Sequence, residues 1–528
     1  MEFDTIIRNG TLIDGSGSPA AHKDVGIVGE RIAAIDDLSA ANAARVIDAS
    51  NLVVAPGFID IHSHADYTLP TRPTADSKTH QGVTTELVGN CGTSSAPLSP
   101  EMQAKGDANS LLGNFGLSWD WDTFGSYLDR LRSVGTAVNV AMLVGHGTVR
   151  EKNMGMTDAK PAAEQVKAMQ KDVSQAMKEG AWGLSTGLIY PPGVFADIDE
   201  IAALAGVAAR EGGIYTSHIR GEAGTVLQAV GEAIEIGRRA HIPVEISHLK
   251  AEQRVNWPKM QKVVEIIRDA RQEGLDVYAD MYPYNAFCTV LSSMLPAWAV
   301  ADGKPAIVKR LSDENTRAEI RKALARDAED GNPGYWQGTL ITYCEGHPEY
   351  SGRNLQDLAE EMGKPPEDAV MDILLYSNVD AGMVQFAMSE ENVEYGLQQD
   401  FIMIGSDGEG RAVEGILSNG NPHPRNYGTF ARVLGYFARQ RKIFSLETAV
   451  YKMTGLPARR IGLHDRGLLK SGYFADVTIF NSQTVIDKAT FIDPHQYAEG
   501  IEYVLVNGTA VIAKGIHTRA LPGRVLVH

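Results

Sequence analysis

The chain has 528 residues, with 44% hydrophobic and 22% charged residues, a composition typical of a globular protein. Its formal net charge of −17 argues against a nucleic-acid-binding surface, and no apolar run approaches the roughly 18 residues needed to span a membrane. The N-terminal residues are acidic where an export signal would be basic, and there are only three cysteines, so we expect a cytoplasmic protein without disulfides.

The two ends of the chain share a β-rich pattern. Residues 6–13 and 504–511 are β-rich runs broken by Asn-Gly, a dipeptide that favours a tight hairpin turn. Further short strand-like runs lie at residues 25–28, 32–35 and 475–480. Because the length exceeds what one hydrophobic core usually organises, we predict a small β-sandwich domain, made from residues 1–55 and 466–528, beside a larger domain.

The larger domain, residues 56–465, alternates strand-like and helical stretches, which is the pattern of a parallel sheet. Strands are predicted at residues 58–62, 84–90, 138–144, 182–186, 214–218, 244–248, 276–280 and 401–406. Helices are predicted at residues 162–179, 197–210, 223–239, 257–273 and 445–454. The simplest closure of this α/β pattern is a (β/α)8 TIM-like barrel, whose chemistry would lie at the carboxyl ends of the strands.

The interval between the last two predicted strands is much longer than one βα unit needs. We interpret residues 287–337 as an inserted lobe over the barrel mouth. The strand-like run at residues 340–344 is either the last strand of this lobe or the true seventh strand of the barrel.

Residues that can bind a metal ion stand at the ends of the predicted strands. Side chains at positions i and i+2 leave a strand on the same face, so two such residues at the end of the first strand can reach one ion. The ligand-type residues are His62, His64, Cys91, His218, His248 and Asp407. Each alone could be a core or turn residue, but a closed barrel would bring all of them to one rim.

Imidazole, thiolate and carboxylate groups together suit Zn²⁺. Cys91, His218 and His248 would make one tight site. The two histidines of the first strand, with Asp407, would either hold a second, weaker ion or shape a water pocket. Zinc lowers the pKa of bound water to about 7, and Asp407 would take the water proton and pass it to a leaving amine.

These motifs resemble the amidohydrolase superfamily, and more closely its N-acyl-D-amino-acid deacylase (D-aminoacylase) family. The superfamily pattern is Pro56-Gly57-Phe58-Ile59-Asp60-Ile61-His62-Ser63-His64 with His218, His248 and Asp407. The closer family pattern lies at residues 89–92, 183–192, 247–250, 282–284 and 423–430. The resemblance covers nearly the whole chain.

The resemblance implies zinc-dependent hydrolysis of the amide bond of a small substrate, an N-acyl-D-amino acid. It implies that Cys91 bridges the metal site, where many relatives have a carboxylated lysine. It also implies that Tyr190, Lys250, Tyr282 and Arg425 bind the substrate carboxylate and neighbouring groups, in keeping with the strong hydrogen bonds that basic side chains make to carboxylates.

Several alternatives stay open at this point. His146, after the third strand, either supports the metal site or contacts the substrate, or else has a purely structural role. A cyclic-amide hydrolase of the hydantoinase or dihydroorotase type would use the same metal chemistry, and a non-catalytic scaffold would keep only the fold. The sequence also leaves open the number of metal ions, whether the protein forms a homo-oligomer, and which substrate side chain is preferred. Apolar residues at 287–298 favour an apolar substrate side chain.

Overall fold

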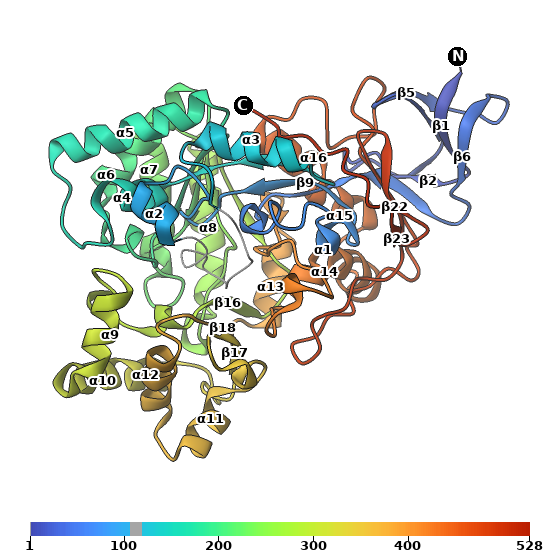
Figure 1. Ribbon diagram of the computed structural model, residues 1–528. Helices are drawn as coiled ribbons and strands as arrows, with labels where there is room; N and C mark the ends of the chain where they lie inside the picture. Colours follow the sequence, from blue (N-terminus) through green and yellow to red (C-terminus); the bar gives the residue numbers. More distant parts are fainter. Residues whose placement is uncertain (1, 106–118) are drawn as a thin grey trace.

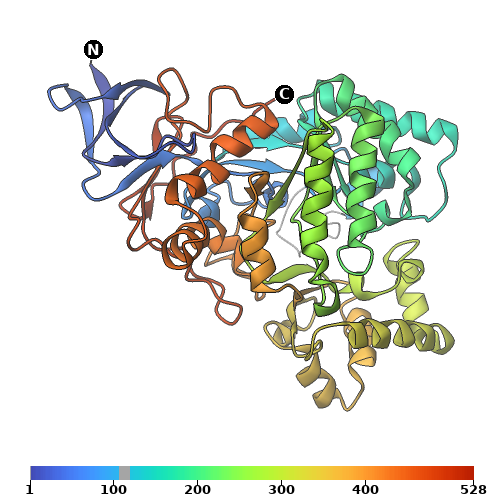
Figure 2. The same cartoon turned by 180° about the vertical axis from the view of Figure 1, so that it is seen from behind.

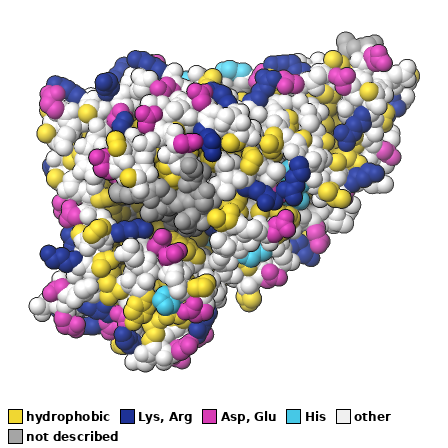
Figure 3. All heavy atoms as spheres, viewed as in Figure 1, with side chains coloured by type: hydrophobic (Ala, Val, Ile, Leu, Met, Phe, Trp, Pro, Cys, Tyr) yellow, Lys and Arg dark blue, Asp and Glu magenta, His cyan; other side chains and the backbone are white. Residues whose placement is uncertain are grey.

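The computed structural model describes residues 2–105 and 119–528. Figure 1 shows a β-rich part at the upper right, a central part in which helices cover the strands, and a lobe below. No helix in the described ranges is both long and apolar enough to cross a membrane. On the face in Figure 3, basic and acidic side chains are interspersed and form no broad basic patch.

Parallel strands form the centre of the molecule. In hydrogen-bonded order, the described strands are β8 (Phe58–Asp60), β9 (Val83–Val88), β10 (Asn139–Met142) with its continuation β11 (Val144–Gly145), β12 (Gly183–Gly187), β13 (Ile214–His218), β14 (Val244–Ile246), β15 (Val277–Met281) and β19 (Ile402–Ile404). The ring closes where the backbone N–H of Asp407 donates to the carbonyl of His62 (2.8 Å). Nearly every strand residue is buried, as expected for parallel strands covered on both faces.

Helices cover the outside of this ring (Figure 2). They are α3 (Phe124–Val134), α4 (His146–Met154), α5 (Ala163–Lys178), α6 (Ile198–Arg210), α7 (Val226–Ala240), α8 (Lys259–Gln272), α13 (Glu390–Leu397), α14 (Arg425–Arg432), the π-helical η9 (Val433–Arg441), α15 (Leu446–Met453) and α16 (Gly455–Ile461). Short helices α1 (Asp76–Thr79) and α2 (Pro100–Lys105) precede them. Buried residues of α7 recur at helical spacing, which explains why its apolar face packs inward. All the predicted helices overlap observed ones.

Two sheets make up the β-rich part. One has the order β5 (Arg31–Asp36), β4 (Asp24–Val28), β1 (Phe3–Arg8), β6 (Ala43–Asp48). The other has the order β23 (Ile516–His517), β22 (Thr509–Ala513), β21 (Ile501–Val506), β20 (Val477–Phe480), β7 (Val53–Pro56), β2 (Thr11–Leu12), β3 (Ala21–His22). Buried residues from both sheets, such as Ile7, Val54 and Leu505, share one apolar cluster. Beyond β23 the chain returns to the ring, where Val525 bridges Val140 of β10.

The two Asn-Gly motifs have different outcomes. Asn507-Gly508 joins the antiparallel strands β21 and β22 as predicted, with positive φ angles of 48° and 79°. The predicted hairpin at Asn9-Gly10 is wrong, because β1 pairs with β4 and β6 while β2 pairs with β3 and β7. Asn9 does adopt the positive φ angle of a turn (64°). The chain crosses at this point from the sheet that contains β1 to the sheet that contains β2.

The lobe lies between β15 and β19 and is larger than predicted. It contains β16 (Ala286–Val290), α9 (Lys304–Ser312), α10 (Glu314–Asp330), β17 (Thr339–Cys344), α11 (Leu355–Met362), α12 (Pro366–Tyr376) and β18 (Ala381–Phe386). The antiparallel order β16-β18-β17 places the run at 340–344 in the lobe and the lobe end well beyond residue 337. That run is not the seventh strand of the ring, because β15 pairs directly with β19.

The lobe has a hydrophobic core of its own, built from residues of its helices and strands, including Leu291, Ile320 and Ile373. Its two ends are adjacent, since the backbone N–H of Met388 donates to the carbonyl of Asn285 (3.1 Å). The lobe is therefore a folded insertion that leaves and rejoins the ring at one point.

Candidate metal centre

Ligand-type side chains meet at the carboxyl-terminal rim of the ring. His62 and His64 follow β8, Cys91 follows β9, His218 ends β13, His248 follows β14 and Asp407 follows β19. None of these residues is more than 6% exposed. Polar groups buried this deeply require partners or an ion to offset the loss of water.

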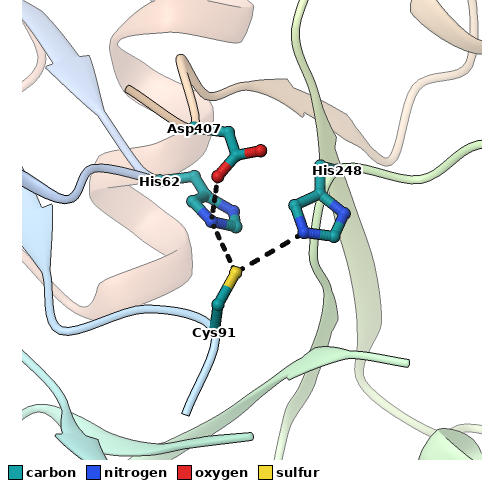
Figure 4. A group of neighbouring side chains, drawn as sticks. All are labelled: His62, Cys91, His248 and Asp407. Carbon is teal, nitrogen blue, oxygen red and sulfur yellow. Dashed lines mark hydrogen bonds and ion pairs between the residues drawn. The ribbon is translucent and has the colours of Figure 1, made fainter. Parts of the chain in front are cut away.

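The Cys91 thiol points toward His62 and His248 (Figure 4). Its Sγ atom is 3.3 Å from His62 Nε2 and 3.5 Å from His248 Nε2. Asp407 Oδ1 lies 3.3 Å from the same His62 nitrogen. One donor atom from each of these four residues lies within 4.8 Å of the others, so the four can converge on a common ion.

The other two predicted ligands, His64 and His218, lie next to this group. His64 Nε2 lies 3.0 Å from Asp407 Oδ1. His218 Nδ1 lies 2.8 Å from His248 Nε2, while the buried His218 Nε2 atom has no hydrogen-bond partner among the described residues. The structure therefore brings the predicted ligand-type residues together.

The backbone is strained at three of these positions. Cys91, His248 and Asp407 have φ angles of 53°, 37° and 49°, in the left-handed region that non-glycine residues rarely adopt. Gly92 has φ 72°, and a Cβ atom there would lie 2.4 Å from the backbone nitrogen of Gly187. The glycine after Cys91 is thus needed for the turn that brings the thiol inward.

The charges of the cluster favour an ionised thiol and carboxylate. Burial alone would raise the pKa of Cys91, but the positive charges of His62 and His248 outweigh it and hold that pKa well below its usual value. Burial likewise opposes ionisation of Asp407, yet Arg425 and the histidines hold its pKa well below the usual value. The site thus presents anionic donors to a cation.

Two further carboxylates contact the cluster, and neither was predicted from the sequence. Asp280 Oδ1 lies 3.1 Å from His62 Nδ1 and accepts a hydrogen bond from the backbone of His248 (2.9 Å). Glu222 Oε1 lies 3.1 Å from His248 Nδ1. Such contacts orient histidine rings toward a metal. Asp280 ends a predicted strand, a signal that could have identified it, whereas Glu222 lies in a loop that carries no such signal.

The basic residues predicted to bind substrate are both ion-paired in this structure. Lys250 Nζ donates to Glu222 Oε1 (2.7 Å) and lies 2.8 Å from His248 Nδ1. Arg425 donates to Asp407 Oδ2 (2.6 Å). Both cations therefore lie beside the candidate ligands, and their charges are balanced by neighbouring carboxylates.

The two predicted tyrosines also lie close to the cluster. The Tyr190 ring packs edge-on against His218, with centroids 5.0 Å apart, and its hydroxyl lies 2.8 Å from Thr289 Oγ1. Both predicted cations lie near the ring of Tyr282, with Lys250 Nζ 5.7 Å and Arg425 Cζ 5.0 Å from its centroid. The buried Tyr282 hydroxyl has no hydrogen-bond partner among the described residues, so it can still donate to a ligand.

A cavity of about 230 Å³ opens onto the cluster. Its lining includes His64, Cys91 and Asp407 together with Tyr190, Lys250 and Arg425. A small acyl amino acid could therefore reach the candidate ligands and the basic side chains at once.

His146 does not face this cavity. Its Nε2 atom lies 2.9 Å from Glu200 Oε1, which also accepts a hydrogen bond from Arg150 (3.1 Å). All three residues are buried. Of the two alternatives for His146, these contacts favour a structural role.

A buried lysine ties together the two strands that carry the first and last ligands. Lys78 Nζ donates to Asp60 Oδ2 (2.6 Å) and to the carbonyl of Gly408 (3.0 Å), and lies 3.4 Å from Glu86. Asp60 also accepts a hydrogen bond from the backbone of Ser406 (2.8 Å). This network fixes the end of β19 against β8.

Replacing Lys78 by methionine is expected to destabilise the protein by about 3–5 kcal/mol, because it leaves the buried carboxylates of Asp60 and Glu86 without their cation. The shift of the denaturant unfolding midpoint measures this loss. Lys262→Met is the matched control, since that lysine is exposed and its ion pair within the described ranges is with Glu265 on the helix surface. Equal midpoints for the two variants would contradict a structural role for Lys78.

The donor set fits zinc. Thiolate, imidazole and carboxylate groups are the protein ligands that zinc prefers, and His218 Nε2, which lies 3.6 Å from Glu222 Oε2, is a further buried nitrogen beside them. The ionised thiol favoured for Cys91 supplies the anionic charge that such an ion requires, and the ionised Asp407 adds a second anionic donor at the His62 side.

Comparison with known proteins places the chain in a family. The model of the amidohydrolase family matches residues 45–512. The chain is 40% identical to a D-aminoacylase and 39% identical to an N-acyl-D-glutamate deacylase, both from Alcaligenes xylosoxydans xylosoxydans; each match covers 99% of this chain and 97% or 96% of the relative. It also matches the structure of an N-acyl-D-glutamate deacylase from Bordetella bronchiseptica, complexed with zinc and a phosphonate mimic of the tetrahedral intermediate (TM-score 0.84, 36% identity, 100% of both chains covered). The chain therefore belongs to the amidohydrolase family.

Proposed function

We propose that this protein is a zinc-dependent hydrolase that cleaves the amide bond of N-acyl-D-amino acids, giving a carboxylate and a free D-amino acid. The observation that carries the proposal is the convergence of Cys91, His62, His248 and Asp407 at the base of a cavity that also contains Lys250 and Arg425. The near full-length similarity to a D-aminoacylase supports the same reaction.

In this proposal Cys91, His218 and His248 hold the tight zinc ion, and His62 and His64 lie beside it. When bound, zinc would polarise the substrate carbonyl and make water more acidic at neutral pH. A second, weaker ion at the His62 side is a further part of the proposal, supported by the approach of Asp407 Oδ1 to the Nε2 atoms of His62 (3.3 Å) and His64 (3.0 Å).

Asp407 acts as the proton carrier. Its ionised carboxylate accepts a proton from the attacking water, whose oxygen bonds to the amide carbon. The same proton then passes to the nitrogen as the carbon–nitrogen bond breaks, which gives a carboxylic acid and a neutral amine. The acid then releases the second proton of the water to the amine, so the final products are a carboxylate and an ammonium group. The ion pair with Arg425 keeps the carboxylate ionised until that transfer.

The substrate carboxylate binds at Lys250, Tyr282, Tyr190 and Arg425. The unpartnered hydroxyl of Tyr282, close to both cations, supports this assignment because it offers a donor to an anion. We further propose a (β/α)8 TIM-like barrel over residues 56–465, a β-sandwich domain from residues 1–55 and 466–528, and a cytoplasmic location. The strand order, the shared core of the two sheets and the three free cysteines support these assignments.

The proposed reaction predicts a metal-dependent and stereospecific activity. Removing metal with a chelator should abolish hydrolysis of N-acetyl-D-methionine, and added Zn²⁺ should restore it, because the thiolate and imidazole donors favour that ion. Hydrolysis of N-acetyl-L-methionine and ring opening of a hydantoin, measured in parallel, should be much slower. Faster ring opening would instead assign the site to cyclic amides, and inertness of the zinc-loaded protein toward all three compounds would favour a scaffold.

A further inference from the structure

The cavity above the candidate ligands has walls from two parts of the chain. Its base and one wall come from the ring, where Lys250 and Arg425 provide positive charge. The lobe adds Met294, Asp327 and Met383 to the same cavity. The lobe is therefore in a position to contact the part of a substrate that does not react.

The positive charge in this cavity is already balanced. Lys250 and Arg425 are the lysine and arginine among its described lining residues, and they pair with Glu222 and Asp407 at 2.7 and 2.6 Å. All four are less than 10% exposed. A substrate with one carboxylate would use these two cations, so a second carboxylate would find no further cation among the described lining residues.

The lobe adds negative charge instead. Asp327 lies in α10, is half-buried and lines the cavity, and its carboxylate has no ion pair or hydrogen bond within the described ranges. Glu252, outside the lobe, lines the cavity as well, but burial and the neighbouring Glu222 raise its pKa to about 8, so Asp327 is the carboxylate that adds charge here. In a partly buried cavity such a charge acts over several ångströms with little screening by salt.

We propose, on the basis of the proposed function, that the enzyme selects against substrates with an acidic side chain and that Asp327 sets this selectivity. Its substrates are then N-acyl-D-amino acids with neutral side chains, which can lie against Met294 and Met383. An acidic side chain in this cavity meets the Asp327 carboxylate, and the repulsion weakens binding of both the substrate and the transition state. Asp327 thus acts as a specificity-determining residue.

The test compares N-acetyl-D-glutamine with N-acetyl-D-glutamate, which differ by one charge at nearly equal size. For the wild-type enzyme, kcat/KM should be at least about tenfold higher for the glutamine compound, as repulsion at a distance of several ångströms predicts. Asp327→Asn should narrow this ratio by about fivefold, mainly by raising kcat/KM for the glutamate compound. Asp330→Asn is the matched control, because it removes the same charge from an exposed position at the end of the same helix and should leave the ratio unchanged.

If kcat/KM of the wild-type enzyme for N-acetyl-D-glutamate equals or exceeds that for N-acetyl-D-glutamine, this inference is overturned and the proposed function stays intact. Equal narrowing of the ratio in Asp327→Asn and Asp330→Asn would also overturn it, since net charge alone would then explain the effect. If the wild-type enzyme hydrolyses none of the three compounds, N-acetyl-D-glutamine, N-acetyl-D-glutamate and N-acetyl-D-methionine, the proposed function itself is overturned. The wild-type ratio tests the proposal even where a variant fails to fold.

Discussion

Asp407→Asn is expected to lower kcat for N-acetyl-D-methionine by at least about a thousandfold while zinc content stays near that of the wild type. The amide keeps the shape of the carboxylate but cannot accept the proton of water. The tight zinc site of the proposal is made by Cys91, His218 and His248, so it does not need the Asp407 charge. Steady-state kinetics and metal analysis of the purified variant measure the two quantities separately.

The control for Asp407→Asn must share its effect on folding. Asp407 is the buried partner of Arg425, and its loss leaves that cation without a counter-charge. Glu409→Gln breaks a similar buried pair two residues away, with Arg411 (2.5 Å), and lies outside the cavity at the metal cluster. It should keep most of the wild-type kcat. Full activity of Asp407→Asn would remove this carboxylate from the mechanism.

Cys91→Ala is expected to lose both zinc and activity. Each loss should exceed the roughly 10–100-fold fall in metal affinity or activity that follows substitution of a residue that only hydrogen-bonds to a metal ligand. Cys91 Sγ contacts nitrogens from two histidines on different strands, so its removal leaves those rings without their shared anionic partner. Zinc per protein chain, measured after dialysis against metal-free buffer, reports the first loss. Activity with added Zn²⁺ reports the second.

Cys344→Ala provides the comparison for the cysteine substitution. This thiol is also buried, but it lies in the hydrophobic core of the lobe, and burial raises its pKa to about 12, so it stays protonated and a poor ligand. The variant should keep its zinc. A full complement of zinc in Cys91→Ala would show that the thiol is no ligand.

The ligand-type residues were predictable because strand ends are marked locally in the sequence. His62 and His64 were predicted on one face of a strand; β8 ends at Asp60, before both histidines, yet their Nε2 atoms still meet at Asp407 Oδ1, at 3.3 and 3.0 Å. His218, His248 and Asp407 each end an apolar run, and parallel strands place all such ends on one rim. Asp280 follows the same rule, but an aspartate at a strand end is common, and only its 3.1 Å contact with His62 reveals its place.

Pairing between distant segments was much less predictable. Asn9-Gly10 has the same turn preference as Asn507-Gly508. Only the second joins paired strands, because the partners of β1 are selected by packing within the β-rich part. Glu222 reaches His248 from a loop, where no periodic pattern marks a residue. The predicted end of the lobe was wrong for a related reason. The strand that completes the lobe sheet, β18, pairs with β16, which lies nearly a hundred residues earlier in the chain.

The independent core of the lobe and its adjacent ends, Asn285 and Met388, have a consequence for engineering. A segment that begins and ends at neighbouring points can be transferred between homologous enzymes as one block, because it is joined to the rest of the chain at two adjacent positions. Chimeras carrying a foreign lobe on this scaffold would keep their thiolate and imidazoles in place while acquiring the donor's preference for side chains. New substrate ranges could then arise by recombination of whole modules, without mutation of the residues that perform the chemistry.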